Sequence, residues 1–226
     1  MIEIENLTVR QDGKTLLSGV TLHIKKGEKV ALSGASGCGK TTLLKTLIGR
    51  YTNDEGSIII DSHPLTIENL KLIRKKLFYL SQDIKPFKNK TTIEYLKLPF
   101  SFLINSDIKF SEEETRNFAK KLLLKEDIFN RPFDTLSGGE KKRVGFLRGL
   151  ILKRDIFLLD EPTSQIDEDS STALVELIST MKDKTVLGVT HDKNFMERCD
   201  RQIDFASLNL VTTKNSVISG GTNGSK

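Results

Sequence analysis

A glycine-rich segment that ends in lysine and threonine carries the strongest chemical signal in this sequence. Residues 34–41 read Gly-Ala-Ser-Gly-Cys-Gly-Lys-Thr and fit the pattern G-x-x-x-x-G-K-[ST]. An apolar, β-rich segment at 29–33 precedes them, and apolar residues at helical spacing follow as far as Gly49. Glycines let the backbone curl around an anion, so that N–H groups and the positive end of the following helix point at phosphates. The segment therefore predicts a P-loop between a strand and a helix.

The side chains of this loop add to the same chemistry. Lys40 would place a positive charge near the β- and γ-phosphates, and the Thr41 hydroxyl would offer an oxygen to Mg²⁺. The alternative is a glycine-rich turn with a lysine beside it, which the strand before and the helix after the loop disfavour. The residues predicted to hold the triphosphate are Gly34, Ala35, Ser36, Gly37, Cys38, Gly39, Lys40, Thr41 and Thr42.

A second segment could also receive a phosphate. Residues 136–140 read Leu-Ser-Gly-Gly-Glu and precede an apolar helical pattern. Ser137 and Glu140 have the spacing of a capping box, which by itself requires only the start of a helix. Gly138 and Gly139, however, remove side chains from that helix N-terminus and leave its N–H groups open to an anion. The chain thus has two potential phosphate sites.

Polar residues follow two predicted buried strands. Residues 156–159, Ile-Phe-Leu-Leu, form a continuous apolar run typical of a strand buried on both faces of a parallel sheet, and Asp160 and Glu161 follow it. The strand at 186–190 is followed by His191, which alone could be structural. Ligands bind at the carboxyl edge of such sheets, where adjacent carboxylates can divide their work between Mg²⁺ and water.

The length of 226 residues allows one large α/β domain or two small ones. The net charge of +5 permits contact with nucleic acid or an anionic membrane, although a solvated lysine-rich surface is the favoured interpretation. No apolar run approaches the roughly 18 residues of a membrane span. The amino terminus lacks the pattern of a signal peptide, and Cys38 and Cys199 are expected as two reduced thiols.

We expect a single domain made of three parts. Within residues 2–30, short alternating segments at 2–4 and 20–24 predict a small antiparallel β-region beside the P-loop core. Residues 91–135 show helical periodicity and predict a helical insertion. Within it, the apolar stretch 96–104 either packs the insertion on the core or docks a partner helix. Residues 1–90 and 136–210 would form the β-subdomain and core, and a flexible tail is expected at 216–226.

The order of the motifs resembles the ATP-binding subunits of ABC transporters over the chain up to about residue 205. A P-loop alone indicates only a nucleoside triphosphate, whereas six motifs in this order are far more specific. They are Walker A at 34–41, the Q-loop at Gln82, the signature at 136–140, Walker B at 156–160 followed by Glu161, the D-loop at 164–167 and the H-loop at His191.

The resemblance implies a P-loop NTPase with a mainly parallel, RecA-like core, an antiparallel β-subdomain and a small α-helical subdomain. It further implies a head-to-tail dimer around two ATP molecules, in which the loop 34–42 of one copy holds the triphosphate. Ser137, Gly138 and Gly139 of the other copy would approach its γ-phosphate. The partners would be a second copy and separate transmembrane permease subunits, which choose the substrate. The chain itself would be cytoplasmic, peripheral on the inner face of the cell membrane through the permease, and no direct nucleic acid contact is expected.

Individual roles also follow from the resemblance. Asp160, Thr41 and Gln82 would support Mg²⁺, and Glu161 would act as general base or orient the attacking water. The other implied catalytic residues are His191, which would hold the γ-phosphate and the water, Gln82, which would sense the nucleotide, and Lys40. Asp167 would connect the two sites. One departure concerns Gln11, which stands where the family has an aromatic residue on adenine, so we expect weaker stacking and looser discrimination between ATP and GTP.

Two further hypotheses concern a subgroup of this family and a rival class of ATPase. Residues 92–100, with Ser-Gly-Gly-Glu-Lys-Lys-Arg at 137–143, look like the bacterial FetA/YbbL-type subunits associated with iron efflux. The rival class is a soluble ABC-type ATPase acting on nucleic acid or translation, but the coiled-coil insertion, zinc module or tandem domain usual in such proteins is missing from the pattern. A nucleotide-binding module without hydrolysis is disfavoured by Glu161 and His191.

Overall fold

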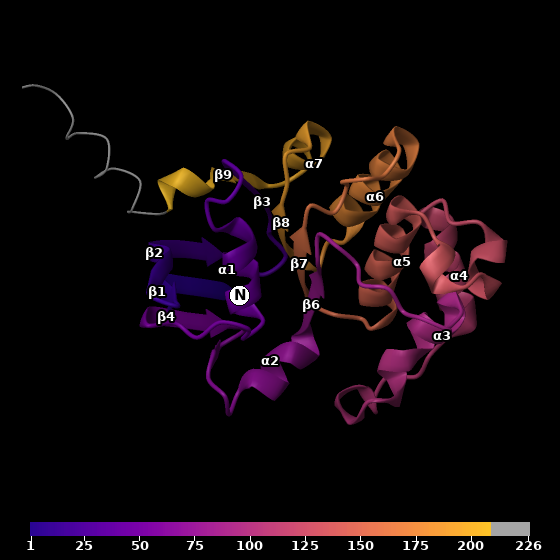
Figure 1. The fold of residues 1–226 in the computed structure, drawn as a ribbon, viewed down its shortest axis with the longest axis horizontal. Coiled ribbons are helices and arrows are strands. Elements are labelled where there is room, and N and C mark those ends of the chain that lie inside the picture. Colours follow the sequence, from indigo (N-terminus) through magenta and orange to yellow (C-terminus); the bar gives the residue numbers. More distant parts are fainter. Residues whose placement is uncertain (209–226) are drawn as a thin grey trace, which may run out of the picture.

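Two β-sheets and a group of helices make up residues 1–208, the part of the chain that this computed structural model describes (Figure 1). The smaller sheet is antiparallel, with strand order β2-β1-β4-β5. The larger sheet has the order β6-β7-β8-β3-β9, and its neighbouring strands all pair in parallel. The predicted α/β fold with a parallel core and an antiparallel β-subdomain is confirmed.

The bounds of the strands are as follows. The antiparallel sheet contains β1 (Ile2–Gln11), β2 (Lys14–Ile24), β4 (Glu55–Ile60) and β5 (His63–Pro64). The parallel sheet contains β3 (Lys29–Ser33), β6 (Leu77–Leu80), β7 (Ile156–Asp160), β8 (Thr185–Val189) and β9 (Arg201–Asp204).

Both faces of the parallel sheet are buried. Phe157 and Leu159 of β7 belong to one apolar cluster, with residues of α5 (Gly138–Ile151) and α6 (Glu168–Thr180). Ile156 and Leu158, which alternate with them, belong to a second cluster with α1 (Lys40–Leu47) and the antiparallel sheet. Because successive side chains of a strand point to opposite faces, an apolar run without alternation is what a doubly covered strand requires.

A helical lobe lies at the far side of α5 (Figure 1). It contains α3 (Thr92–Lys97) and α4 (Glu112–Lys121), joined by the 3₁₀ turns η1 (Leu98–Ser101) and η2 (Leu103–Asn105) and followed by η3 (Glu126–Asn130) and η4 (Phe133–Thr135). The other short helices are α2 (Leu70–Lys76), α7 (Lys193–Glu197) and η5 (Phe205–Ser207). The flexible tail expected at 216–226, like residues 209–210 of the expected core, lies outside the described residues.

The apolar stretch at 96–104 is divided between core and surface. Leu96 is fully buried and joins the large apolar cluster, whereas Phe102 is 49% exposed and Leu103 is 88% exposed. One half of the stretch therefore packs the lobe, and the other half faces outward.

No helix within residues 1–208 is both long and apolar enough to cross a bilayer.

Strand direction assembles the candidate site. In a parallel sheet, the carboxyl ends of all strands meet at the same edge. Here the ends of β3, β6, β7 and β8 lead into the P-loop, Gln82, Asp160 with Glu161, and His191 respectively.

Candidate nucleotide site

The P-loop has a shape that only glycine can maintain at several positions. Gly34, Gly37 and Gly39 have φ values of 140°, 77° and 111°. A Cβ at Gly39 would lie 2.8 Å from Leu17 Cδ2 and 3.1 Å from the Leu16 carbonyl oxygen, so the loop also packs closely on β2. Gly39 caps α1 without a side-chain hydrogen bond, which leaves the first N–H groups of the helix for another acceptor.

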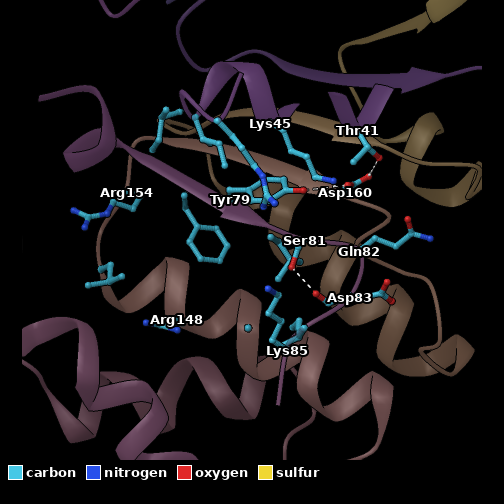
Figure 2. Close-up of a pocket in the computed structure, with 18 of the residues that line it drawn as sticks. Thr41, Lys45, Tyr79, Ser81, Gln82, Asp83, Lys85, Arg148, Arg154 and Asp160 are labelled. Carbon is cyan, nitrogen blue, oxygen red and sulfur yellow. Dashed lines mark hydrogen bonds between the residues drawn. The ribbon is translucent and has the colours of Figure 1, made fainter. Parts of the chain in front are cut away.

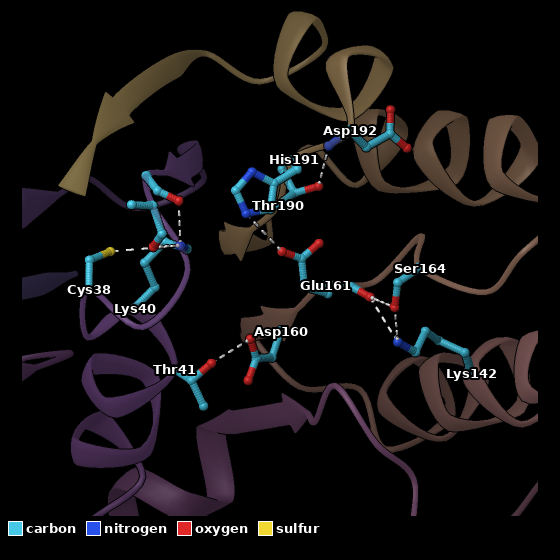
Figure 3. A network of polar contacts seen from close by, with 12 residues as sticks. Cys38, Lys40, Thr41, Lys142, Asp160, Glu161, Ser164, Thr190, His191 and Asp192 are labelled. Atoms are coloured by element: carbon cyan, nitrogen blue, oxygen red, sulfur yellow. Dashed lines mark hydrogen bonds and ion pairs between the residues drawn. The ribbon is translucent and has the colours of Figure 1, made fainter. Parts of the chain in front are cut away.

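Lys40 spans the mouth of this loop. It is only 7% exposed, and its Nζ donates to the carbonyl oxygens of Gly34 at 2.6 Å and Ala35 at 2.8 Å (Figure 3). Cys38 Sγ lies 3.7 Å from the same ammonium. The positive charge is thus held directly over the turn of backbone that is predicted to receive phosphates.

A cavity of about 440 Å³ brings most of the predicted side chains together. Its walls come from the P-loop and from the strand ends opposite. The residues that line it are Ser36, Gly37, Gly39, Lys40, Thr41, Thr42, Gln82, Asp160, Glu161, Val189 and His191. Six of the residues predicted around the triphosphate lie outside this lining, although all are described. They are Gly34, Ala35 and Cys38 of the P-loop, and Ser137, Gly138 and Gly139 of the signature segment.

Asp160 is held by hydroxyl groups on both of its oxygens. The Thr41 Oγ1 donates to Oδ1 at 3.0 Å, and the Tyr79 hydroxyl donates to Oδ2 at 3.2 Å. Asp160 is 1% exposed. Burial and the nearby Asp160 charge raise the pKa of Tyr79, which keeps this hydroxyl a donor. A carboxylate beside a threonine hydroxyl supplies the hard oxygen ligands that Mg²⁺ prefers, so these residues fit that ion.

Tyr79 is a site residue that the sequence reasoning missed. It lies on β6, beside β7, where it pairs with Leu158 two positions before Asp160. The sequence offers only a partial signal, the polar tip of a tyrosine in an otherwise apolar strand, and the neighbouring strand is known only from the pairing. Its hydroxyl makes it a positioning residue for the carboxylate (Figure 2).

We expect Tyr79→Phe to raise the Mg²⁺ concentration needed for half-maximal ATP hydrolysis more than it lowers the maximal rate. The change keeps the ring and removes the bond to the Asp160 carboxylate. A hydrogen bond to a charged group contributes about 1.5 kcal/mol, or about tenfold in an equilibrium constant. A magnesium titration of ATP hydrolysis should show the half-saturating concentration rising by about that factor. Tyr95→Phe, a matched change in the helical lobe, is the control. An unchanged magnesium titration in Tyr79→Phe would contradict the role of the hydroxyl.

Glu161 is held in an uncommon backbone conformation. Its φ is +49°, and its N–H donates to the Val189 carbonyl at 2.9 Å. Its own carbonyl accepts from Ser164 N at 3.2 Å, Ser164 Oγ at 3.0 Å and Lys142 Nζ at 2.9 Å. The carboxylate then lies 3.6 Å from His191 Nε2, with its side chain 19% exposed (Figure 3). A carboxylate and an imidazole at this edge can accept a proton from water and bind a phosphate oxygen.

The signature segment forms the helix start that its spacing predicts. Ser137 Oγ accepts from Glu140 N at 3.1 Å, and Glu140 Oε2 accepts from Ser137 N at 2.8 Å. Because Ser137 accepts in this bond, its hydroxyl proton can still be donated to a ligand. Burial raises the pKa of Glu140, but hydrogen bonds from Arg131 and Ser137 outweigh it and the net pKa is lowered.

The D-loop packs on this same helix start. A Cβ at Gly139 would lie 2.7 Å from the Gln165 carbonyl oxygen, and one at Gly138 would lie 2.4 Å from Gln165 Oε1. Asp167 caps α6 by accepting from Ser170 N at 2.9 Å. The glycines of the signature thus allow close contact with the D-loop, besides leaving the helix N-terminus open.

A second cavity, of about 810 Å³, lies between the parallel sheet and the helical lobe (Figure 2). Thr41, Gln82 and Asp160 contribute to the walls of both cavities. The second cavity is also lined by basic side chains from both sides: Lys45, Arg50, Lys85, Arg148 and Arg154. Arg154 is buried and donates to the Lys75 carbonyl and to Asn105, so it joins α2 to η2.

The comparisons with known proteins agree with this geometry. A sequence model described as "ABC transporter" matches residues 17–164. The chain is 33% identical over 219 residues to the energy-coupling factor transporter ATP-binding protein EcfA1 of Mycoplasmopsis synoviae, and 93% of this chain and 81% of that protein are covered. It is 32% identical over 212 residues to the methionine import ATP-binding protein MetN of Clostridium acetobutylicum, with 89% and 64% covered.

A solved structure shares the fold. It is the dimeric post-hydrolysis state of the ATP-binding cassette MJ0796 bound to ADP and Pi, with a TM-score of 0.79, 31% identity, and 90% of this chain and 94% of that chain covered. Some curated relatives are longer, and the chain spans 49% and 37% of two of them.

Proposed function

Because this chain belongs to the ABC transporter family, we propose that two copies of it close head-to-tail around two Mg-ATP molecules and drive a separate membrane permease. The chain is an ATP-binding and ATP-hydrolysing subunit of that family. The observation that carries the head-to-tail arrangement is the separation of its two phosphate-competent helix starts. The P-loop lines the cavity with Asp160 and Glu161, and the signature segment does not. A second copy supplies the missing surface.

The P-loop residues hold the triphosphate in this arrangement. The backbone of the loop and the N-terminus of α1 bind phosphate oxygens, and Lys40 leaves its loop carbonyls for the β- and γ-phosphates. Ser137 and Gly139 of the partner copy then donate to the γ-phosphate from the N-terminus of α5. Asp167 connects the two sites across the dimer.

The other residues of the cavity prepare the attacking water. Thr41, Asp160 and Gln82 would hold Mg²⁺, which would neutralise charge on the phosphates. Glu161 accepts the proton of the water or orients it, and His191 holds the γ-phosphate. Gln11 is the last residue of β1. The weaker stacking on adenine that we expect from it stays a prediction.

We place the permease at the second cavity, which supports a role for Gln82 as a sensor. Gln82 forms part of both walls, so a partner seated in the second cavity touches the same residue that lines the nucleotide cavity. The basic lining fits an acidic segment of that partner. Docked in this way, the chain lies on the cytoplasmic face of the membrane.

The finer hypothesis is export of a metal such as iron. It is supported by the resemblance of residues 92–100 and 137–143 to FetA/YbbL-type subunits. The relatives reported above are named as ATP-binding proteins of an energy-coupling factor transporter and of methionine import, which favours transport over the nucleic-acid alternative without selecting a substrate. The permease is the partner that determines the transported substrate.

The test is the recovery of the native chain from detergent-solubilised membranes. We expect it to co-purify, in a fixed ratio, with a multi-span polypeptide. Lys85→Glu, which reverses a charge in the second cavity, should reduce this recovery by about tenfold. Lys125→Glu, an exposed lysine of the helical lobe outside that lining, is the matched control. Recovery only with ribosomes or nucleic acid would overturn the transporter assignment.

A further inference from the structure

A lysine of the signature helix is buried beside the hydrolytic residue. Lys142 lies one turn into α5 and is 1% exposed. Its Nζ donates to the Glu161 carbonyl at 2.9 Å and to Ser164 Oγ at 2.6 Å (Figure 3). Burying an ammonium group is costly, so a lysine that only filled space would be replaced with advantage by an apolar side chain. The two bonds indicate what its charge is used for.

The first bond fixes the peptide of Glu161. A glutamate at φ +49° is disfavoured and persists only where its surroundings hold it. Val189 binds its N–H, while Lys142 and Ser164 bind its carbonyl. Rotation of that peptide would turn the Cα–Cβ bond and move the carboxylate away from its position 3.6 Å from His191.

The second bond makes α5 and the D-loop one unit. Gly139 packs against the Gln165 carbonyl at the start of the helix, and Lys142 reaches Ser164 one turn later. The carboxylates that face the ammonium are Asp83 from the segment after Gln82, Glu161 itself and Asp160. Burial lowers the pKa of Lys142, while these three charges oppose that effect.

We propose that Lys142 is a positioning residue that ties the signature helix to Glu161, so that ATP seated on the signature of one chain sets the hydrolytic geometry in that same chain. The inference rests on the proposed head-to-tail function. In that arrangement the signature of a chain meets the ATP of its partner, whereas Glu161 acts on the ATP of its own P-loop. Lys142 is the one direct side-chain bond among the described contacts from α5 to the Glu161 backbone. This bond makes hydrolysis at each nucleotide site depend on ATP binding at the other site.

Lys142→Met is the informative variant. It keeps the length of the side chain and removes both bonds, in a position where an apolar group is well tolerated. Lys142 does not line the nucleotide cavity, so ATP affinity and dimer formation should be retained. Displacement of a catalytic group by a fraction of an ångström to 1 Å lowers the rate by about 10- to 100-fold. We expect kcat to fall in that range and the Hill coefficient for ATP to fall to about 1.

The controls separate positioning from folding. Lys141→Met changes the neighbouring lysine, whose partly exposed side chain bonds to the Asp134 carbonyl, and should leave kcat within about twofold. Lys142→Arg restores a cationic donor and should recover part of the rate, as should the neutral donor in Lys142→Gln. In a double-mutant cycle, Lys142→Met with Ser164→Ala should lose less than the sum of the two single changes, because both act on the same carbonyl.

The measurements are steady-state ATP hydrolysis, binding of a fluorescent ATP analogue, ATP-dependent dimerisation by light scattering, and thermal unfolding. A reduced kcat and Hill coefficient with binding, dimerisation and unfolding temperature retained supports the proposal. An unchanged kcat, or a loss of rate that parallels a loss of dimer and of thermal stability in both Lys142→Met and Lys142→Gln, overturns it. Glu161→Gln is measured beside them. If it fails to trap a dimer, the head-to-tail function fails, independently of Lys142.

Discussion

Glu161→Gln is expected to lower ATP turnover by at least about a hundredfold and to trap a dimer that forms only with ATP. The amide keeps the shape of the side chain but can no longer accept the proton of the attacking water. The contacts that hold the residue involve its backbone, and they are unaffected by the change. Binding of the triphosphate uses the P-loop and the partner signature, so closure should proceed while reopening waits for hydrolysis.

The measurement pairs phosphate release with light scattering in the presence of Mg-ATP. Glu176→Gln, the same change on the exposed face of α6, is the matched control and should behave as the unmodified chain. ATP hydrolysis by Glu161→Gln at the unmodified rate would show that another group activates the water. Loss of turnover with no dimer in ATP would instead remove the support for closure around the nucleotide.

The sequence could predict the parts of the site whose chemistry is local. Gly34, Gly37 and Gly39 are required by the turn itself, and their positive φ values match that requirement. The apolar run of β7 indicates a doubly buried strand because alternation is absent, and this places Asp160 at the carboxyl edge. In such segments the residue types follow directly from the local backbone conformation or burial, so the sequence pattern reveals the structure.

Contacts between segments far apart in the chain could not be predicted in this way. Tyr79 reaches Asp160 across a strand pairing, and nothing local to Phe-Tyr-Leu reveals which strand lies beside it. Lys142 looks like an ordinary surface charge after the signature glycines. It is buried because the D-loop folds over the start of α5. Both residues depend on tertiary packing, which overrides the local preference of their segments.

Strand extents differ from the pattern for a related reason. Short alternating segments were predicted at 2–4 and 20–24, yet β1 and β2 extend over Ile2–Gln11 and Lys14–Ile24. Register shifts, with Asn6 at φ +47°, interrupt the alternation inside β1 and conceal its length. β9, which is polar and at the sheet edge, is held by pairing with β3 and has no periodic signal of its own.

The division of each site between two copies leads to the second large effect, which is complementation between inactive chains. Lys40→Met removes the charge over the P-loop and leaves the signature intact. Ser137→Asp keeps a good N-cap for α5 but places a negative charge where the γ-phosphate must approach. Each variant alone should lose hydrolysis by at least about a hundredfold, whereas Ser137→Asn, a neutral N-cap of similar size, should retain much more.

A mixture of the two inactive variants should regain activity if the sites are shared head-to-tail. The heterodimer contains one site built from the intact P-loop of the Ser137→Asp chain and the intact signature of the Lys40→Met chain, and its other site carries both lesions. With random pairing, half of the dimers are mixed and each has one intact site, so the rate that returns is at most about a quarter of the unmodified rate. It is smaller to the extent that Lys142 makes hydrolysis at one site depend on ATP at the other. A chain carrying both substitutions, mixed with Lys40→Met, forms no intact site and is the control. If each chain completed its own site, mixing would restore nothing, because no single chain would hold an intact P-loop and an intact signature together.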